Sequence, residues 1–297
     1  MSYIYRTLIL IFTQNLKMMK KKSHLFIVLV LCTLVNTINA QAPVNDKTKI
    51  DLHHWKVTLP TGTPDPIEVE VPELLSFNEN PDIKNNMYID DIDGGLVFYA
   101  TPGVNTRNTS YARCELREQL EPGNDNVNWT FAEGGVMEGV LKVEDISKNK
   151  KGKYDKVVVM QIHGRLSNED RAKIKKKDND APPILKVSWY DGNIRLISKV
   201  LRKGKSGSDI LYKESWMDAE SYVFPAKVGF DKFSLKIIAE KNKLSVILND
   251  KYTKVYDSKD IKKWGVFENY FKAGNYLAFN NPNGYAKVKF YDLNVKH

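Results

Sequence analysis

Residues Lys156–Gly164 read KVVVMQIHG, a run rich in β-branched residues that ends in an amide and an imidazole two positions apart. Such a run is typical of a buried β-strand, in which successive side chains point to opposite faces. We therefore expect Gln161 and His163 to lie side by side where the strand leaves a packed region and enters a groove. The alternative is a hydrogen-bonded pair at the end of a sheet. The face of Gln161 and His163 is predicted to include Val157 and Val159, and the opposite face Val158, Met160 and Ile162.

Strand signals like this one recur along the chain after residue 50, separated by turn residues. Helical periodicity is weak throughout; only parts of Val71–Leu75 and Ile261–Glu268 are compatible with a turn or two of helix. Many short strands indicate an all-β sandwich or barrel, and this length favours a β-jelly roll of two large curved antiparallel sheets with a concave polar groove. The expected strands are Ile50–Pro60, Gly94–Ala100, Tyr111–Leu120, Val136–Val143, Lys156–His163, Ile184–Tyr190, Asn193–Val200, Phe233–Ala239, Leu244–Leu248, Lys254–Tyr256, Tyr270–Phe279 and Ala286–Val295.

Residues 1–40 differ from the rest of the chain because they contain no Asp or Glu. Lys20–Lys22 precede an apolar run, Leu25–Val35, which is too short to span a membrane, and Ala40 supplies a small residue for cleavage. This pattern predicts a secretory signal peptide over residues 1–40 and a secreted protein, periplasmic or extracellular, without a transmembrane segment. Residues 41–297 contain no linker or repeat, so we expect them to form a single catalytic domain.

Two details of the signal segment leave alternatives open. Translation from Met18 or Met19 would produce the same signal, because the first 17 residues add nothing to it. Cys32 lies in a sequence that resembles a lipoprotein cleavage box, but Leu31 is bulky where a small residue is expected. Lipoprotein tethering through Cys32 is therefore the weaker alternative to ordinary secretion.

Removal of this segment would leave a mildly basic protein. It holds five of the 45 Lys and Arg residues and none of the 36 Asp and Glu residues, so the net charge falls from +9 to +4. We expect no nucleic-acid partner; the charge suits a soluble acidic polymer, or solubility alone.

Cys114 would be the remaining cysteine, which excludes an internal disulfide. The histidines lack metal-ligand spacing, so we predict no metal and no cofactor.

A second polar strand is predicted at Tyr111–Leu120, YARCELREQL. Alternation places Arg113, Glu115 and Arg117 on one face, with Cys114 on the other. A glutamate between two arginines would hold both guanidinium groups in place, and their planar forks match a carboxylate. The alternative is a solvated outer face of a sheet.

A third polar strand is predicted at Glu268–Phe279, ENYFKAGNYLAF. Tyr270, Lys272, Gly274 and Tyr276 share one face, and the glycine would let a substrate approach the backbone. The alternative is an aromatic strand packed in the core. Together, the three strands predict a cationic groove for an acidic, extended substrate.

Other catalytic classes fit this set of residues poorly. No Ser or Cys pairs with His163 as a nucleophile, and the acidic pair of a retaining glycosidase is missing because Glu115 lies between arginines.

The charged segment Gly164–Pro183 follows His163 directly. Long loops inside a domain are often functional, so we expect a mobile lid over the groove, with a solvated surface loop as the alternative.

Three stretches carry a family resemblance. Arg113–Glu118 (RCELRE), Gln161–His163 (QIH) and Tyr270–Tyr276 (YFKAGNY) resemble the signature motifs of alginate lyases of polysaccharide lyase family 7, in the order of that family. The resemblance spans most of the chain after the signal segment. It implies a β-jelly roll whose concave sheet binds alginate without a required metal, and we expect a monomer.

The chain departs from the family pattern at two places. Cys114 stands where the family usually has Ser or Thr, and we expect little effect because the side chain points away from the groove. Leu277-Ala278 replaces the usual Asn-Gln, which would remove two polar groups near one end of the cleft. The Ile162 form of the middle motif resembles members that favour guluronate-containing stretches.

The resemblance also implies roles for individual residues in a β-elimination. Arg113 and Gln161 would neutralise the carboxylate of the reacting uronate, His163 would remove the C5 proton, and Tyr276 would protonate the leaving oxygen. Tyr276 could also serve as the base for the epimer whose proton lies on the other side. Substrate binding is expected from Glu115, which orients the arginines, and from Arg117, Lys272 and Tyr270.

Three alternatives to an alginate lyase remain open. A non-catalytic carbohydrate-binding module would bind the same polymer but form no double bond. A lyase of similar fold could act on another polyuronate, such as glucuronan. A jelly-roll glycoside hydrolase is disfavoured because the acidic pair is missing.

Overall fold

The computed structural model describes residues 50–105, 110–257 and 259–297 of the chain. They belong to one compact unit, Asn45–His297. The predicted signal peptide, its alternative start sites and Cys32 lie outside the described residues. Among the described helices, none combines the length and the hydropathy that crossing a bilayer requires.

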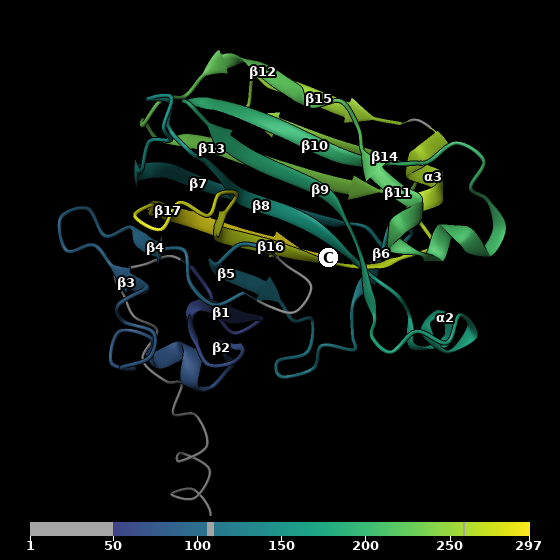
Figure 1. Cartoon of the computed structure of the whole chain (residues 1–297), viewed down its shortest axis with the longest axis horizontal. Coiled ribbons are helices and arrows are strands. Elements are labelled where there is room, and N and C mark those ends of the chain that lie inside the picture. Colours follow the sequence, from purple (N-terminus) through teal and green to yellow (C-terminus); the bar gives the residue numbers. More distant parts are fainter. Residues whose placement is uncertain (1–49, 106–109, 258) are drawn as a thin grey trace, which may run out of the picture. The chain divides into compact units, whose positions relative to one another are not determined.

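The larger of two antiparallel sheets contains the strand that ends in Gln161 and His163. This strand, β8 (Lys156–Arg165), lies between β9 (Asp180–Tyr190) and β16 (Glu268–Leu277) (Figure 1). The described part of this sheet has ten strands, and β16 is followed on its other side by β5, the strand of the RCELRE motif. The remaining strands are β5 (Arg113–Glu118), β1 (Trp55–Gly62), β2 (Pro66–Val69), β10 (Asn193–Leu201), β11 (Trp216–Asp218), β12 (Tyr222–Lys227) and β6 (Trp129–Thr130).

The smaller sheet has seven strands in the described residues, and the all-β prediction is confirmed. The two helical segments predicted from the sequence are present as the short helices η1 and α3. The strands, in sheet order, are β15 (Tyr252–Tyr256), β14 (Lys243–Leu248), β13 (Phe233–Glu240), β7 (Gly135–Ile146), β17 (Ala286–Lys296), β4 (Leu96–Ala100) and β3 (Met87–Ile89); the described helices are η1 (Glu73–Ser76), α2 (Asn168–Lys173), η2 (Gly207–Leu211), η3 (Lys213–Ser215) and α3 (Lys259–Trp264).

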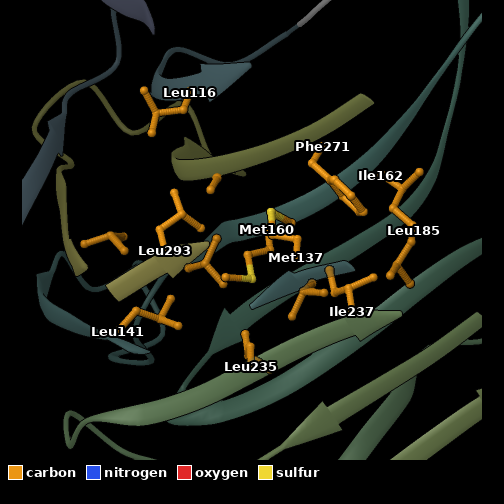
Figure 2. Close-up of a cluster of buried hydrophobic side chains, with 14 of the residues drawn as sticks. Leu116, Met137, Leu141, Met160, Ile162, Leu185, Leu235, Ile237, Phe271 and Leu293 are labelled. Atoms are coloured by element: carbon orange, nitrogen blue, oxygen red, sulfur yellow. The ribbon is translucent and has the colours of Figure 1, made fainter. Parts of the chain in front are cut away.

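The hydrophobic core lies between the two sheets. Figure 2 shows apolar side chains from both sheets gathered in one cluster, and the ten labelled ones are at most 4% exposed. Full burial of such a side chain contributes about 1.5–3 kcal/mol, so the core determines which face of each strand is turned outward. The labelled residues are Leu116, Met160, Ile162, Leu185 and Phe271 from the larger sheet and Met137, Leu141, Leu235, Ile237 and Leu293 from the smaller one.

The alternation of side chains in β8 is interrupted in the middle of the strand. The pairing with β9 is irregular between Val158 and Met160, where β8 accommodates one extra residue. As a result Val157 and Val159 both join the hydrophobic core cluster, whereas Val158 does not. The prediction that Val157 and Val159 share a face with Gln161 was wrong, because a β-bulge shifts the two-residue period without a sequence signal here.

The segment predicted as a long loop, Gly164–Pro183, is more regular than expected. Strand β8 continues to Arg165, the helix α2 follows, and β9 begins at Asp180, before the two prolines (Figure 1). The pairing of β8 with β9 is irregular around Pro183, which allows a residue without a backbone N–H to lie in the sheet. The sequence signal was misleading because proline argues against a strand. Motion of this segment stays a prediction.

Candidate active site

A cavity of about 660 Å³ opens on the face of the larger sheet that is turned away from the core. All of the predicted site residues except Glu115 line it, and Glu115 is completely buried. The three polar stretches predicted from the sequence therefore meet at one place. The predicted residues in its wall are Arg113, Arg117, Gln161, His163, Tyr270, Lys272 and Tyr276.

The strand register explains why these side chains converge. Gln161 of β8 is the Cα partner of Lys272 of β16, which in turn is the partner of Arg117 of β5. His163 and Tyr270 are partners in the same way. Adjacent strands lie about 4.8 Å apart and directly opposite residues share a face, so a row of polar groups crosses the sheet.

Glu115 is the buried centre of the site. One carboxylate oxygen accepts a short hydrogen bond from the amide of Gln161, and the other lies 2.5 Å from Lys272 Nζ and 3.3 Å from Arg113 Nη1. A fully buried carboxylate requires such partners, since an unpaired charge in this position would be costly. The prediction that Glu115 orients both arginines is correct for Arg113 alone. Arg117 instead pairs with Asp125, its Nη1 atom 2.8 Å from Oδ1.

Arg113 keeps one donor unused. Its guanidinium lies over the Tyr276 ring, with Cζ 4.2 Å from the centroid. Among the described residues, its buried Nη2 atom has no hydrogen-bond partner. A guanidinium fork with a free N–H beside a cavity is suited to a carboxylate ligand.

His163 has the protonation state that a base needs. Its Nδ1 atom lies 2.9 Å from the carbonyl oxygen of Gly164, which can only accept a hydrogen bond, so the neutral ring carries its proton on Nδ1 and a lone pair on Nε2. The ring stacks on Tyr270, with centroids 5.3 Å apart. Burial, together with the positive charges of Lys272 and Arg113, lowers the pKa of His163 well below 6.5. The imidazole is therefore neutral at neutral pH.

Burial also changes the titration of the neighbouring side chains. It lowers the pKa of Lys272 to about 8, although Glu115 favours the charged form. Burial raises the pKa of Tyr270 to about 12 and also raises that of Tyr276, although the nearby arginines favour the phenolate. Both phenols are thus protonated at neutral pH, and Tyr276 can act as a proton donor.

Arg117 and Tyr270 form the wall at the other side of the site. The Arg117 guanidinium lies over the Tyr270 ring, with Cζ 4.2 Å from the centroid. Its nitrogens donate to the carbonyl oxygens of Glu118 and Asp125 and to the side chain of Asn128. This arginine therefore fixes the backbone near Asp125, and its predicted contact with substrate stays a prediction.

Several residues of the cavity wall were not predicted. Lys56 and Lys186 lie on strands β1 and β9, where the alternation of polar and apolar residues gave a usable signal. Others come from loops, which carry no periodicity that could place them. The residues of the wall that were missed are Lys56, Thr58, Glu68, Ser110, Tyr111, Asp125, Asn126, Lys186, Lys199 and Lys213. The segment Gly164–Pro183, which was predicted to lie over the groove, contributes Gly164, Arg165, Asp178, Asn179, Asp180 and Pro183.

The two departures from the family pattern lie on the core side of the sheet or outside the cavity wall. Cys114 is fully buried and its thiol donates to the Asn86 carbonyl oxygen, 3.3 Å away, so it points away from the cavity as predicted. Leu277 is also fully buried in the core cluster, and Ala278 is absent from the described wall. The expectation that Leu277 alters the cleft directly was wrong, because this position faces the core.

Gly274 serves the pairing of strands. Its φ angle is +135°, which favours glycine, and a Cβ atom there would lie 2.8 Å from the Cys114 carbonyl oxygen and 3.3 Å from the Phe98 ring. The space that a side chain would need is thus occupied by the neighbouring strand and the core. Glycine is therefore required at position 274 by the packing of β16 against β5 and the core, and not by the predicted approach of a substrate.

The described residues contain no group of three His, Cys, Asp or Glu side chains that could hold a metal ion. What the cavity wall offers is a neutral imidazole with a free Nε2, a protonated phenol and an arginine with an unused N–H. This set can bind a carboxylate, remove a proton beside it and protonate a leaving oxygen.

Comparisons with known proteins agree with this chemistry. A family model described as "Alginate lyase" matches residues 50–297. A curated alginate lyase from Klebsiella pneumoniae is 26% identical in an alignment that covers 84% of this chain and 90% of that protein. The crystal structure of alginate lyase A1-II′, a member of polysaccharide lyase family 7, is 30% identical with a TM-score of 0.65, covering 84% of this chain and 96% of that one.

A fourth comparison concerns the fold alone. The structure of an alginate lyase from Pseudomonas aeruginosa is 22% identical, with a TM-score of 0.62, and covers 84% of this chain and 100% of that one. Together with the two sheets described above, these likenesses confirm the predicted β-jelly roll.

Proposed function

This chain belongs to the alginate lyase family, polysaccharide lyase family 7, and we propose that it cleaves alginate by β-elimination in the cavity on its larger sheet. The products would be unsaturated oligouronates. The observation that carries the proposal is the imidazole of His163, whose Nε2 lone pair is available in the same cavity wall as Arg113 and Tyr276.

The first requirement of this reaction is to neutralise the carboxylate of the uronate that reacts. The C5 proton is only weakly acidic while that carboxylate is fully charged, and negative charge builds up on it as the proton leaves. Arg113 offers an ionic N–H, and the amide of Gln161 is held beside it by Glu115. Donors fixed in advance stabilise such developing charge most effectively.

Elimination then follows, with one proton taken from C5 and one given to the leaving oxygen. Nε2 of His163 takes the C5 proton, the C5–H electrons form the C4–C5 double bond, and the C4–O bond breaks. The departing oxygen takes the phenolic proton of Tyr276. For the C5 epimer whose proton faces Tyr276, Nε2 of His163 would first take the phenolic proton, and the resulting phenolate would remove the C5 proton and pass it to the departing oxygen.

We also propose a preference for guluronate-containing stretches, which rests on the Ile162 form of the middle motif. Ile162 is fully buried, so its influence would pass through the positions of Gln161 and His163 on either side of it. Initial rates on polyguluronate and polymannuronate test this directly; a higher rate on polymannuronate would contradict it.

The proposed setting of the enzyme is outside the cytoplasm, as a single-domain monomer. Residues 1–40 support secretion through their signal-like pattern, and the remaining cysteine, Cys114, is buried and unavailable for an intermolecular disulfide. Sequencing the N-terminus of the protein recovered from the producing cells tests cleavage after Ala40. Size-exclusion chromatography with light scattering tests the monomer.

One assay tests the catalytic proposal against its alternatives. The purified protein is incubated with polymannuronate, polyguluronate and glucuronan, while ultraviolet absorbance of the new double bond and product size are followed. Rising absorbance on either alginate block supports the proposal. Binding without absorbance would indicate a carbohydrate-binding module, and a response to glucuronan alone would indicate a different polyuronate lyase. The His163→Ala variant, expected to lose at least ~100-fold in turnover while remaining folded, is the matched control.

A further inference from the structure

Lys186 lies one strand away from the centre of the proposed reaction. It is half-buried on β9, it is the Cα partner of Gln161 on β8, and it lines the cavity. Its neighbours Leu185 and Val187 are fully buried in the core cluster, so the alternation of the strand turns Lys186 toward the cavity. The row of polar groups described above therefore continues past Gln161 to a lysine.

The charge balance of the cavity wall sets Lys186 apart. Within the described residues, every other Lys or Arg of the wall has a carboxylate within 4 Å, whereas Lys186 has none. The ion pairs are Lys56 with Glu68 and Asp125, Arg113 and Lys272 with Glu115, Arg117 with Asp125, Arg165 with Glu268, Lys199 with Asp218, and Lys213 with Asp180.

The surroundings of Lys186 leave its charge without a direct counter-ion. Burial is the main influence that lowers its pKa, and the positive charges of Lys199 and Lys156 act in the same direction. The carboxylates of Asp218 and Glu115 oppose this effect, but both are paired with other cations. A cation that is partly removed from water and surrounded by like charges is costly unless an anion joins it. Since no carboxylate of the described residues lies within ion-pair distance of Lys186, a ligand entering the cavity can supply the direct counter-ion.

We propose that Lys186 binds the carboxylate of the uronate residue next to the one being cleaved. The inference rests on the proposed function, because a polyuronate carries a carboxylate on every ring. The reacting carboxylate is assigned to Arg113 and Gln161, which both contact Glu115. Lys186 lies on the far side of Gln161 from Arg113 in the sheet, so it faces a different ring. On the opposite side of Gln161 the charge of Lys272 is already balanced by Glu115. Lys186 is thus a substrate-binding residue that selects for a charged sugar at this subsite.

The test compares the purified wild-type enzyme with the Lys186→Gln variant on alginate. We expect the KM to rise about tenfold, the value of one charge-assisted hydrogen bond, while kcat stays within about twofold. Lys186→Arg keeps the charge and should recover most of the lost affinity. Lys153→Gln removes the same charge from an exposed position outside the described cavity wall, and it controls for long-range attraction of the polymer.

The outcomes separate this inference from the function on which it rests. An active wild-type enzyme with an unchanged KM in Lys186→Gln would overturn the inference alone, and so would a loss of kcat at unchanged KM. An equal rise of KM in Lys153→Gln would also overturn it, since the effect would then be general electrostatics. A wild-type enzyme that forms no double bond on any alginate would overturn the proposed function first, and the inference with it.

Discussion

The guanidinium of Arg113 lies over the ring of Tyr276, with Cζ 4.2 Å from the ring centroid. The two residues are Cα partners on β5 and β16, so the contact is fixed by the register of the sheet. It places the group assigned to the substrate carboxylate beside the group assigned to the leaving oxygen. Burial raises the pKa of Tyr276 more than the charge of Arg113 lowers it, so the phenol keeps its proton at neutral pH.

Tyr276→Phe should separate proton donation by the phenol from the support that its ring gives to Arg113. The variant keeps the aromatic surface under Arg113 and loses only the O–H, so we expect kcat to fall at least ~100-fold while KM changes little. Tyr276→Ala also removes the surface that holds Arg113, and its KM should rise as well. Initial rates from double-bond absorbance measure both. Turnover close to the wild-type value in Tyr276→Phe would eliminate the phenol as the proton donor.

The acid limb of the kcat/KM profile should lie at a lower pH than a histidine with an ordinary pKa would give. The base must be neutral, and the pKa of His163 is held well below 6.5 by burial and by Lys272 and Arg113. We therefore expect kcat/KM to stay nearly constant from pH 7 to pH 6, where an unperturbed imidazole would lose about two-thirds of its neutral fraction. Lys272→Gln removes one of the charges that lower this pKa, and its acid limb should move to higher pH. An acid limb at the same pH in both proteins would contradict this coupling.

The alkaline limb should report on Lys272. Burial lowers its pKa to about 8, so the ammonium loses its proton as the pH rises through that value. The wall of the cavity then becomes less positive, and KM for alginate should increase between pH 7 and pH 9. Lys272→Arg, which stays charged throughout this range, should flatten the increase. If KM rises equally in the arginine variant, another group is responsible.

Most of the fold was predictable because its strands carry the two-residue period of half-buried sheets. β13 and β17 were assigned from the sequence to within one or two residues. The bulge at Val158–Met160 was not, because no glycine or break in hydrophobicity marks it. The first residues of β9 were missed for a different reason: Pro182 and Pro183 lie in a strand whose pairing is irregular enough to tolerate them.

The site was predictable where strands build it and unpredictable where loops do. Gln161, His163 and Lys272 follow from alternation on two strands that happen to be neighbours in the sheet. Asp125, which takes Arg117 away from Glu115, lies in a loop without periodicity, and its pairing depends on the course of the chain in three dimensions. Lys186 had a signal, since Leu185 and Val187 flank it, but its importance appears only once the charges around it are paired.

Replacing Glu115 should damage both stability and activity. Glu115→Gln leaves Lys272 and Arg113 without their buried counter-charge, and breaking a buried ion pair in this way typically costs about 3–5 kcal/mol. We expect a matching fall in the free energy of unfolding by urea and a large loss of kcat, because the glutamine has one acceptor oxygen where Glu115 has two, and these two oxygens serve Gln161, Lys272 and Arg113. Glu138→Gln, which breaks an exposed pair with Lys236, is the control and should cost at most about 1 kcal/mol. Equal effects in the two variants would show that the buried carboxylate has no special role.

Gly274→Ala should show that the site depends on the close approach of two strands. The alanine must adopt a φ near +135° and place its Cβ 2.8 Å from the Cys114 carbonyl oxygen, so β16 has to move away from β5. We expect a loss of about 1–3 kcal/mol of stability from backbone strain, and a further loss of kcat because Tyr276, two residues on, shifts relative to Arg113. Gly152→Ala is the matched control: its φ is +73°, but nothing lies within 4 Å of the added Cβ. Gly152→Ala should lose part of this stability through backbone strain, as measured by urea unfolding, and should keep full activity, as measured by initial rates. A Gly274→Ala enzyme with wild-type kcat would mean that the placement of Tyr276 tolerates a displaced strand, and the register argument for the site would fail.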